Sequence, residues 1–268
     1  MLVVKGKIKN KIIVCGYPKS GNTWLTKLTA ELVDCPYAGF WCAPFHATEL
    51  RETVSEKSNR LCFKAHHTIE QLMYSLDLYG NGSEKIIYIH RDPRAIAVSA
   101  AHFFSLQPRC LRIRNLFSLL PKGLRLYREL FHSHRYKIDV FVKGIVEGTK
   151  QNPFLETPWE EHVKAYKDRK DILFLGYESL LKDTCSEAVN ICNFLNISRS
   201  EDEINKAIHE QSFETQKRRY EQNGDVFMTR FLRRGENESW REELEERHLK
   251  YIEEHIGDTM KELGYTFG

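Results

Sequence analysis

The segment from Lys11 to Leu32 constrains the fold of this chain more than any other. It opens with an apolar, β-prone run, continues through a loop that contains Gly16 and Gly21, and ends in a stretch whose leucines share one helical stripe. A strand, a loop and a helix in this order form a phosphate cradle, because the loop amides and the positive end of the helix dipole converge on an anion. The sequence therefore predicts an α/β protein with a P-loop-like phosphate-binding loop.

The position of the lysine separates this loop from that of nucleotide triphosphatases. Gly16-x-x-x-x-Gly21 has the triphosphatase spacing, but the next residue, where that motif has lysine, is Asn22, and Thr23 follows it. The lysine lies inside the loop, at Lys19. A cradle that keeps its amides and relocates its cation weighs against the Mg²⁺-triphosphate geometry of an ATPase or GTPase.

Length and composition bound the remaining choices. The chain has 268 residues, 41% of them apolar, and we expect one large α/β domain over 1–268. A formal charge of +3 is too small to imply a nucleic-acid partner. Seven cysteines without C-x-x-C spacing, and no secretory segment before Gly16, lead us to expect reduced thiols and a cytoplasmic location. No apolar run approaches the roughly 20 residues of a membrane span.

Three further apolar runs are predicted to be strands with polar residues at their carboxyl ends. They cover Arg60–Lys64, Lys85–His90 and Asp171–Tyr177. Alternation places Lys64 and His66 on the same side if the strand geometry persists. We therefore expect a central, mostly parallel sheet flanked by helices, with its ligand at the carboxyl ends of the strands. Helices are expected over Ala95–Phe104, Glu178–Leu195 and Trp240–Leu263.

The loop Tyr17–Trp24 resembles the 5′-phosphosulfate loop of sulfotransferases that use 3′-phosphoadenosine 5′-phosphosulfate (PAPS), with Asn22 where many members carry threonine. Three more ordered segments resemble this family, and the resemblance spans Tyr17 to Trp240. Tyr88–Arg94 and its continuation resemble the 3′-phosphate segment, and Phe231–Gly235 resembles the second 3′-phosphate loop. The resemblance implies that PAPS contacts come from Lys19, Ser20, Gly21, Asn22, Thr23, Trp24, Arg91, Ser99, Tyr177 (adenine), Ser212 (near the adenine, after Gln211 where threonine is frequent), Arg233, Arg234 (where lysine is usual) and Gly235.

Lys64 and His66 match the family's catalytic lysine and histidine in type and spacing, with His67 as the nearest competitor. The resemblance implies that His66 is the general base, a role that a near-neutral pKa suits. Lys19 and Lys64 would offset the charge that grows on the bridging and equatorial oxygens. No metal is implied.

The chain is thus expected to be a PAPS-dependent sulfotransferase, in which a hydroxyl or amine attacks sulfur in line and 3′,5′-ADP leaves. Two alternatives are a P-loop kinase, which would want lysine at Asn22 and a magnesium ligand, and a non-catalytic 3′,5′-ADP-binding protein. A small molecule, a lipid and a saccharide all remain open as the acceptor, and the oligomeric state remains open too. The Pro158-Trp159 pair and the following Glu161-His162-Val163 resemble a family segment near the acceptor site.

Two segments allow two interpretations each. A basic helical insertion or lid is expected at about 105–150, and its 109–137 part could contact an anionic acceptor or a membrane surface, or be a docked helix pair with a solvated face. The aromatic stretch Tyr37–His46 could wall an acceptor pocket or cover the core. The cationic residues of the basic segment are Arg109, Arg112, Arg114, Lys122, Arg125, Arg128, Arg135 and Lys137.

Overall fold

The computed structural model describes residues 10–42, 60–106, 134–150, 152, 155–232 and 238–267. The chain divides into two compact units. The first comprises Met1–Arg91 and His162–Leu232, and the second comprises Asp92–Glu161 and Arg233–Gly268. The expectation of one domain over 1–268 stays a prediction.

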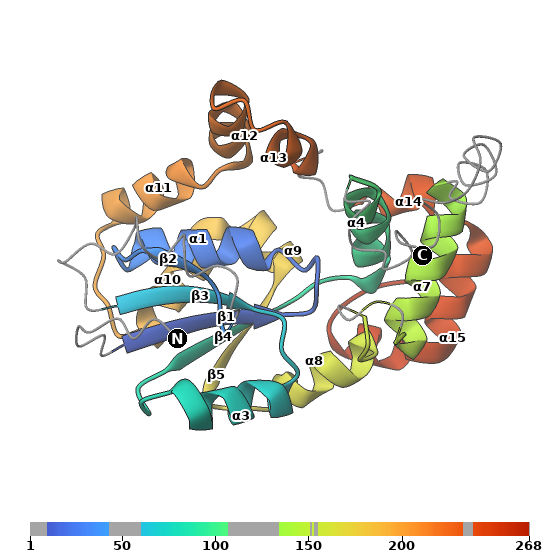
Figure 1. The fold of residues 1–268 in the computed structure, drawn as a ribbon, viewed down its shortest axis with the longest axis horizontal. Helices are drawn as coiled ribbons and strands as arrows, with labels where there is room; N and C mark the ends of the chain where they lie inside the picture. Colours follow the sequence, from blue (N-terminus) through green and yellow to red (C-terminus); the bar gives the residue numbers. More distant parts are fainter. Residues whose placement is uncertain are drawn as a thin grey trace, which may run out of the picture. The chain divides into compact units, whose positions relative to one another are not determined.

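The first unit is built on a five-stranded sheet whose order is β2-β3-β1-β4-β5 (Figure 1). Every pairing in it is parallel. This confirms the predicted α/β class with a parallel central sheet. The strands are β1 (Asn10–Gly16), β2 (Tyr37–Phe40), β3 (Arg60–Ala65), β4 (Lys85–His90) and β5 (Ile172–Gly176).

The strand register brings four carboxyl ends nearly level. Cys15 of β1 lies opposite Ala65 of β3, Gly16 lies opposite Ile89 of β4, and His90 lies opposite Gly176 of β5. Since the strands are parallel, the residues that follow them gather at one edge of the sheet, where open α/β sheets bind ligands.

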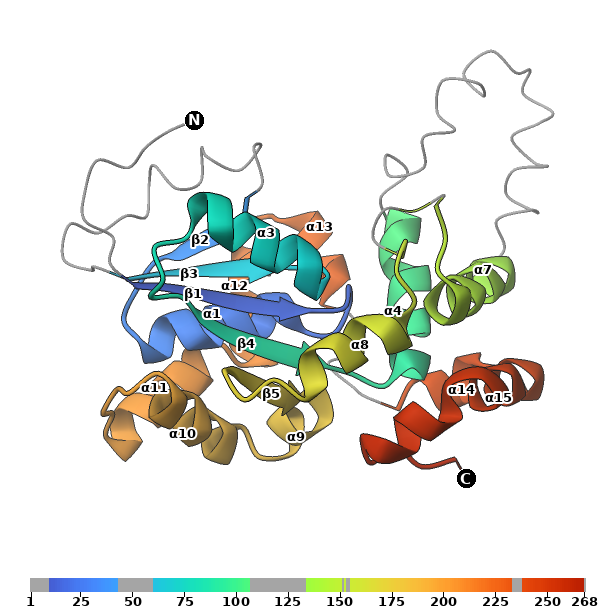
Figure 2. The same ribbon diagram turned by 90° about the horizontal axis from the view of Figure 1, so that it is seen from below.

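Helices cover both faces of this sheet. Helix α1 (Asn22–Leu32) lies over one face and α3 (Ile69–Tyr79) over the other (Figures 1 and 2). The remaining helices of the unit are α8 (Trp159–Lys167, which begins in the second unit), α9 (Tyr177–Lys182), α10 (Thr184–Phe194), α11 (Glu201–Glu210), α12 (Phe213–Gln222) and α13 (Val226–Phe231).

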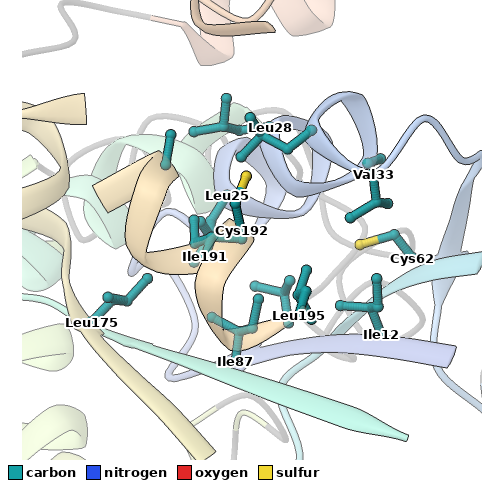
Figure 3. Packing of buried hydrophobic residues seen from close by; sticks show 14 of the residues in the cluster. Ile12, Leu25, Leu28, Val33, Cys62, Ile87, Leu175, Ile191, Cys192 and Leu195 are labelled. Atoms are coloured by element: carbon teal, nitrogen blue, oxygen red, sulfur yellow. The ribbon is translucent and has the colours of Figure 1, made fainter. Parts of the chain in front are cut away.

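Strand alternation explains the core on the α1 face. Ile12 and Val14 of β1 belong to one buried cluster, while Ile13 between them points to the opposite face. Leu28 of α1 is fully buried in this cluster. Figure 3 shows its packing, which includes Leu25, Ile87, Leu175, Ile191, Cys192 and Leu195.

The second unit contains α4 (Pro93–Leu106), α7 (His134–Glu147), α14 (Trp240–Glu243) and α15 (Glu246–Glu262). Asp92 accepts a hydrogen bond from the Arg94 amide at 2.8 Å and pairs with its guanidinium at 2.7 Å, which anchors the start of α4. The Arg94 guanidinium also stacks on Trp240, with 4.0 Å from Cζ to the ring centroid.

Three sequence-based expectations about elements were wrong. Strand β2 was expected to be part of a connection, because four residues that include Gly39 carry no readable alternation and depend on pairing with β3. The helix expected over Glu178–Leu195 is two helices, α9 and α10, since Asp183 ends the first and caps the second through the Ser186 amide at 2.9 Å. The helix expected over Trp240–Leu263 is interrupted at Leu244, which has extended backbone.

Most of the basic 105–150 segment lies outside the described residues. Of its cations, Arg135 and Lys137 fall in α7, and Arg135 pairs with Glu245 at 2.5 Å. The lid and membrane interpretations therefore stay hypotheses. Within the described part of the chain, no helix is both long enough and apolar enough to cross a bilayer.

Replacing Leu28 with alanine should lower the free energy of unfolding by about 2–5 kcal/mol, because a fully buried leucine leaves a cavity under α1. Leu78→Ala in α3 is the matched control, since Leu78 is 54% exposed and its loss should cost less than about 0.5 kcal/mol. Urea unfolding measures both values. Equal costs for the two variants would contradict this packing.

Candidate active site

The loop after β1 requires glycine at position 21. Gly21 has φ +94° and is the N-cap residue of α1. A Cβ placed there would lie 2.5 Å from Cδ2 of Tyr177, so an L-residue would be both strained and in collision. The Ser20 amide donates to the Tyr17 carbonyl at 3.2 Å, which closes the turn before the helix. The backbone is therefore shaped to bring amides to the start of α1, as a phosphate cradle needs.

Asn22 ties the ends of two strands together. Its Nδ2 donates to the Gly16 carbonyl at 3.0 Å and to the Ala65 carbonyl at 2.9 Å, and the residue is buried. Both hydrogens of the amide are thereby used on the carbonyls of the last residues of β1 and β3. The position that holds lysine in triphosphatases thus serves a structural purpose here.

His66 follows β3 and lies beside this junction. Its Nδ1 is 2.9 Å from the Gly16 carbonyl. Nδ2 of Asn22 is also 3.2 Å from this nitrogen, but both hydrogens of that amide are directed to the Gly16 and Ala65 carbonyls. Since the Gly16 carbonyl can only accept, we assign the proton to Nδ1 and the lone pair to Nε2. The Phe40 ring lies 5.7 Å from the His66 ring. Burial, and next the positive charge of Lys64, lower the pKa of His66 to about 3.

Three cationic side chains gather at this edge of the sheet. Lys64 donates from Nζ to Oγ1 of Thr23 at 2.9 Å and lies 4.0 Å above the Phe40 ring centroid. Burial, and then the charges of Arg91 and Lys64, lower the pKa of Lys19 well below its usual range. Like charges held this close favour an anion among them.

Arg91 offers donors that the described residues do not use. Its Nη1 donates to the Lys19 carbonyl at 3.1 Å, and its Cζ lies 4.1 Å above the Tyr177 ring centroid. Within the described residues, its buried Nε and the buried Oγ of Ser20 have no hydrogen-bond partner. Buried polar groups are nearly always satisfied, so these two atoms fit a phosphorylated ligand.

Trp24, Tyr177 and Ser212 form a second group in the same unit. Trp24 meets Tyr177 edge-on with ring centroids 5.9 Å apart, and its Nε1 donates to the Gln211 carbonyl at 3.1 Å. Ser212 caps α12 by accepting from the Thr215 amide at 3.3 Å. The Gln211 side chain donates to Glu31 at 3.0 Å, so its amide group stabilises the packing of the protein itself.

Not every predicted site residue is brought to this edge within the first unit. Ser99 lies in α4 of the second unit and is partly exposed. Arg233, Arg234 and Gly235 lie outside the described residues. Cofactor binding by these four residues stays a prediction.

His162 forms a buried network that the sequence analysis did not assign to the site. Its Nδ1 is 2.7 Å from the Tyr88 hydroxyl, and its ring meets Tyr17 edge-on at 5.5 Å. Its Nε2 is buried without a hydrogen-bond partner in the described part of the chain, and burial lowers the pKa of His162 to about 4. The resemblance of its segment to one near an acceptor site was the available signal.

The glycine-bearing cradle, the cation cluster and the unused donors describe an α/β protein whose strand ends are suited to a phosphorylated, nucleotide-like ligand. A family model described as the sulfotransferase domain matches residues 9–264. The chain belongs to this sulfotransferase family and is a PAPS-dependent sulfotransferase.

Relatives and solved structures agree with this assignment. Sulfotransferase 2A1 of Macaca fascicularis is 24% identical over 94% of this chain and 86% of its own length, and the Homo sapiens protein is 25% identical over 94% and 86%. Mouse sulfotransferase SULT7A1 complexed with PAP has a similar fold, with a TM-score of 0.66 and 23% identity over 94% of this chain and 84% of that chain. Retinol dehydratase in complex with androsterone and the inactive cofactor PAP also has a similar fold. Its TM-score is 0.62, and it is 21% identical over 96% of this chain and 82% of that chain.

Gly21→Ala should abolish measurable binding of 3′,5′-ADP, because the new Cβ would collide with Tyr177. Gly82→Ala is the matched control: Gly82 has φ +78°, but no atom of the described residues lies within 4 Å of the added Cβ. Both changes cost about 1 kcal/mol of left-handed strain, and the collision is added at Gly21 alone. Calorimetric binding of 3′,5′-ADP distinguishes them, and undiminished binding by Gly21→Ala would contradict the cradle geometry.

Acid should destabilise the protein below pH 6.5. Burial lowers the pKa of His66 to about 3, and of His90 and His162 to about 4, whereas the unfolded chain titrates near 6.5. As pH falls from 6.5 towards 4.5 the unfolded state binds about three more protons, so stability should fall by up to about 4 kcal/mol per pH unit. Urea unfolding at pH 7, 6 and 5 measures the slope.

The His162→Gln variant provides the comparison for this slope. Glutamine removes one buried imidazole without adding a charge, so the pH dependence should decrease by about one proton. An unchanged slope in this variant would show that His162 does not stay neutral in the folded state.

Proposed function

We propose that this chain transfers the sulfuryl group of PAPS to a hydroxyl or amine of a small-molecule acceptor and releases 3′,5′-ADP, with His66 as the general base. The observation that carries the proposal is the 2.9 Å contact between Nδ1 of His66 and the Gly16 carbonyl. Because that contact holds the proton on Nδ1, Nε2 keeps a lone pair that can take a proton from the acceptor.

The low pKa of His66 should change when the donor substrate binds. Positive charge on Lys64 and Lys19 contributes to it, so a bound anion that offsets these charges should raise the pKa of His66 towards neutrality. The histidine then becomes a stronger base when the donor substrate is in place. In the unloaded protein it stays neutral and ready to accept a proton at any physiological pH.

The cationic residues divide between binding and chemistry in this proposal. Lys19 and Lys64 offset the charge that develops on the transferring group, and the amides of Ser20–Trp24 hold the 5′-phosphate. Arg91 binds the 3′-phosphate through its unused Nε, as a dianion needs several donors. The other contacts proposed for the nucleotide come from Tyr177, Ser212, Ser99, Arg233, Arg234 and Gly235.

Phe40 supports an acceptor site beside His66. Within the aromatic stretch, Trp41 is 5% exposed and its Nε1 donates a hydrogen bond to Oγ of Ser75 at 2.8 Å. Trp41 therefore belongs to the core. Phe40 instead lies against the His66 ring and the Lys64 ammonium group, the two groups to which this proposal gives the chemistry. The similar proteins include 3-beta-hydroxysteroid sulfotransferase of Cavia porcellus and amine sulfotransferase of Oryctolagus cuniculus, which supports a small acceptor with a hydroxyl or an amine.

The kinase alternative is less well supported. A P-loop kinase would need a lysine where Asn22 uses both amide hydrogens on strand-end carbonyls. We further propose that the two units act as one sulfotransferase domain, since the family match spans both. Six free cysteines among the described residues support a reducing, cytoplasmic setting.

His66→Asn should lower kcat by about 10²–10⁴-fold, while binding of 3′,5′-ADP changes little, since asparagine can still donate to the Gly16 carbonyl but cannot take a proton. His67→Asn is the matched control, because the buried Nδ1 of this adjacent histidine has no hydrogen-bond partner among the described residues, so its replacement should not cause this loss. The assay uses labelled PAPS without Mg²⁺ against phenols, sterols, amines and saccharides.

Three outcomes would count against the proposal. Equal losses in the two variants would remove His66 as the base. Binding of 3′,5′-ADP without sulfation of any acceptor would favour a non-catalytic binding protein. Turnover of Mg-ATP in place of PAPS would favour the kinase.

A further inference from the structure

Two histidines and a glutamate converge in the second unit, and none of the three is among the residues assigned to the reaction. His102 lies near the end of α4, His134 is the first residue of α7 and Glu243 is the last residue of α14. The Nε2 atoms of the two histidines lie 2.7 Å and 2.6 Å from the same oxygen, Oε2 of Glu243. The two imidazole rings are 4.2 Å apart between centroids.

The donor atoms have the spacing of a metal site. Nε2 of His102, Nε2 of His134 and the Glu243 carboxylate oxygen all lie within 4.8 Å of one another. Ligand atoms around a tetrahedral Zn²⁺ with bonds of about 2.1 Å lie about 3.4 Å apart. Small rotations of three side chains, two of them partly exposed, would bring the observed spacing to that value.

The donor chemistry matches as well. Two imidazoles and one carboxylate form a donor set used by zinc enzymes, with a fourth position left for water. Without a metal, both Nε2 atoms must carry protons to bond the carboxylate. With a metal, the proton of each neutral ring moves to Nδ1 and the Nε2 lone pair becomes the ligand.

We propose that His102, His134 and Glu243 form a binding site for a divalent transition-metal cation of the Zn²⁺ class. A cation held there would join the end of α4, the start of α7 and α14, whose ligands lie up to 141 residues apart in the sequence. By linking these three helices, the cation would stabilise the second unit. The sequence-based expectation of no metal concerned the sulfuryl transfer, and this site takes no part in that reaction.

Co²⁺ is the probe, because its visible absorption reports coordination number and ligand type. The full chain, free of any histidine tag, is titrated with Co²⁺ at pH 7.5, and Zn²⁺ is then added in competition. The wild type should bind one equivalent with the intense bands of a four- or five-coordinate ion and no thiolate charge-transfer band.

His134→Gln and Glu243→Gln should each weaken binding by more than about 10-fold, since each removes a ligand. His134 is exposed at the start of a helix, so this variant tests the site without disturbing the core. The matched control is His255→Gln, an exposed histidine of α15 in the same unit, which should bind Co²⁺ like the wild type.

A second readout is thermal unfolding with and without Zn²⁺. A cation that binds the folded state raises the Tm of the wild type and of His255→Gln, and should leave that of His134→Gln unchanged. Equal Co²⁺ affinities of the wild type and His134→Gln, absence of binding, or a thiolate band would each overturn the proposal. Any of these results would leave the three side chains as a hydrogen-bonded triad.

Discussion

The candidate active site depends on the side-chain amide of Asn22. One amide nitrogen joins the carbonyl that ends β1 to the carbonyl that ends β3, at 3.0 Å and 2.9 Å. The first of these carbonyls also accepts from His66, so the phosphate loop and the histidine are held by the same few atoms. Gly16 and Ala65 are the last residues of their strands, and a buried carbonyl without a partner would be costly there. The Asn22 amide gives both carbonyls a hydrogen-bond donor and also fixes the position of the β1 end relative to the β3 end.

The electrostatic arrangement follows from that geometry. Level strand ends bring Lys64, Lys19 and Arg91 to one edge, where like charges and burial lower the pKa values of Lys19 and His66. Such a cluster is unfavourable by itself and is relieved by a bound anion. The cation cluster of the unliganded protein thus favours binding of a polyanionic ligand, which agrees with membership of a family that uses PAPS.

Some structural elements could be predicted from the sequence because they depend on local chemistry. The strand-loop-helix of Lys11–Leu32, the strands before His66 and Arg91, and the Asp92 cap of α4 follow from alternation, glycine placement and capping. Strand β2 could not be read, since its four residues adopt strand geometry by pairing with β3. The break at Asp183 was missed because apolar spacing continues through it, and capping decides where one helix ends and the next begins.

The sequence by itself determined the class of this protein, because the predicted phosphate cradle and the candidate site residues at strand ends are encoded in short contiguous motifs with fixed spacing. Tertiary structure alone decided what those motifs do to one another. Tyr177 against Gly21, the tautomer of His66, the use of Gln211 on Glu31, and the meeting of His102, His134 and Glu243 join residues far apart in the chain. Such contacts depend on how packed elements converge, and no local pattern in the chain specifies that convergence.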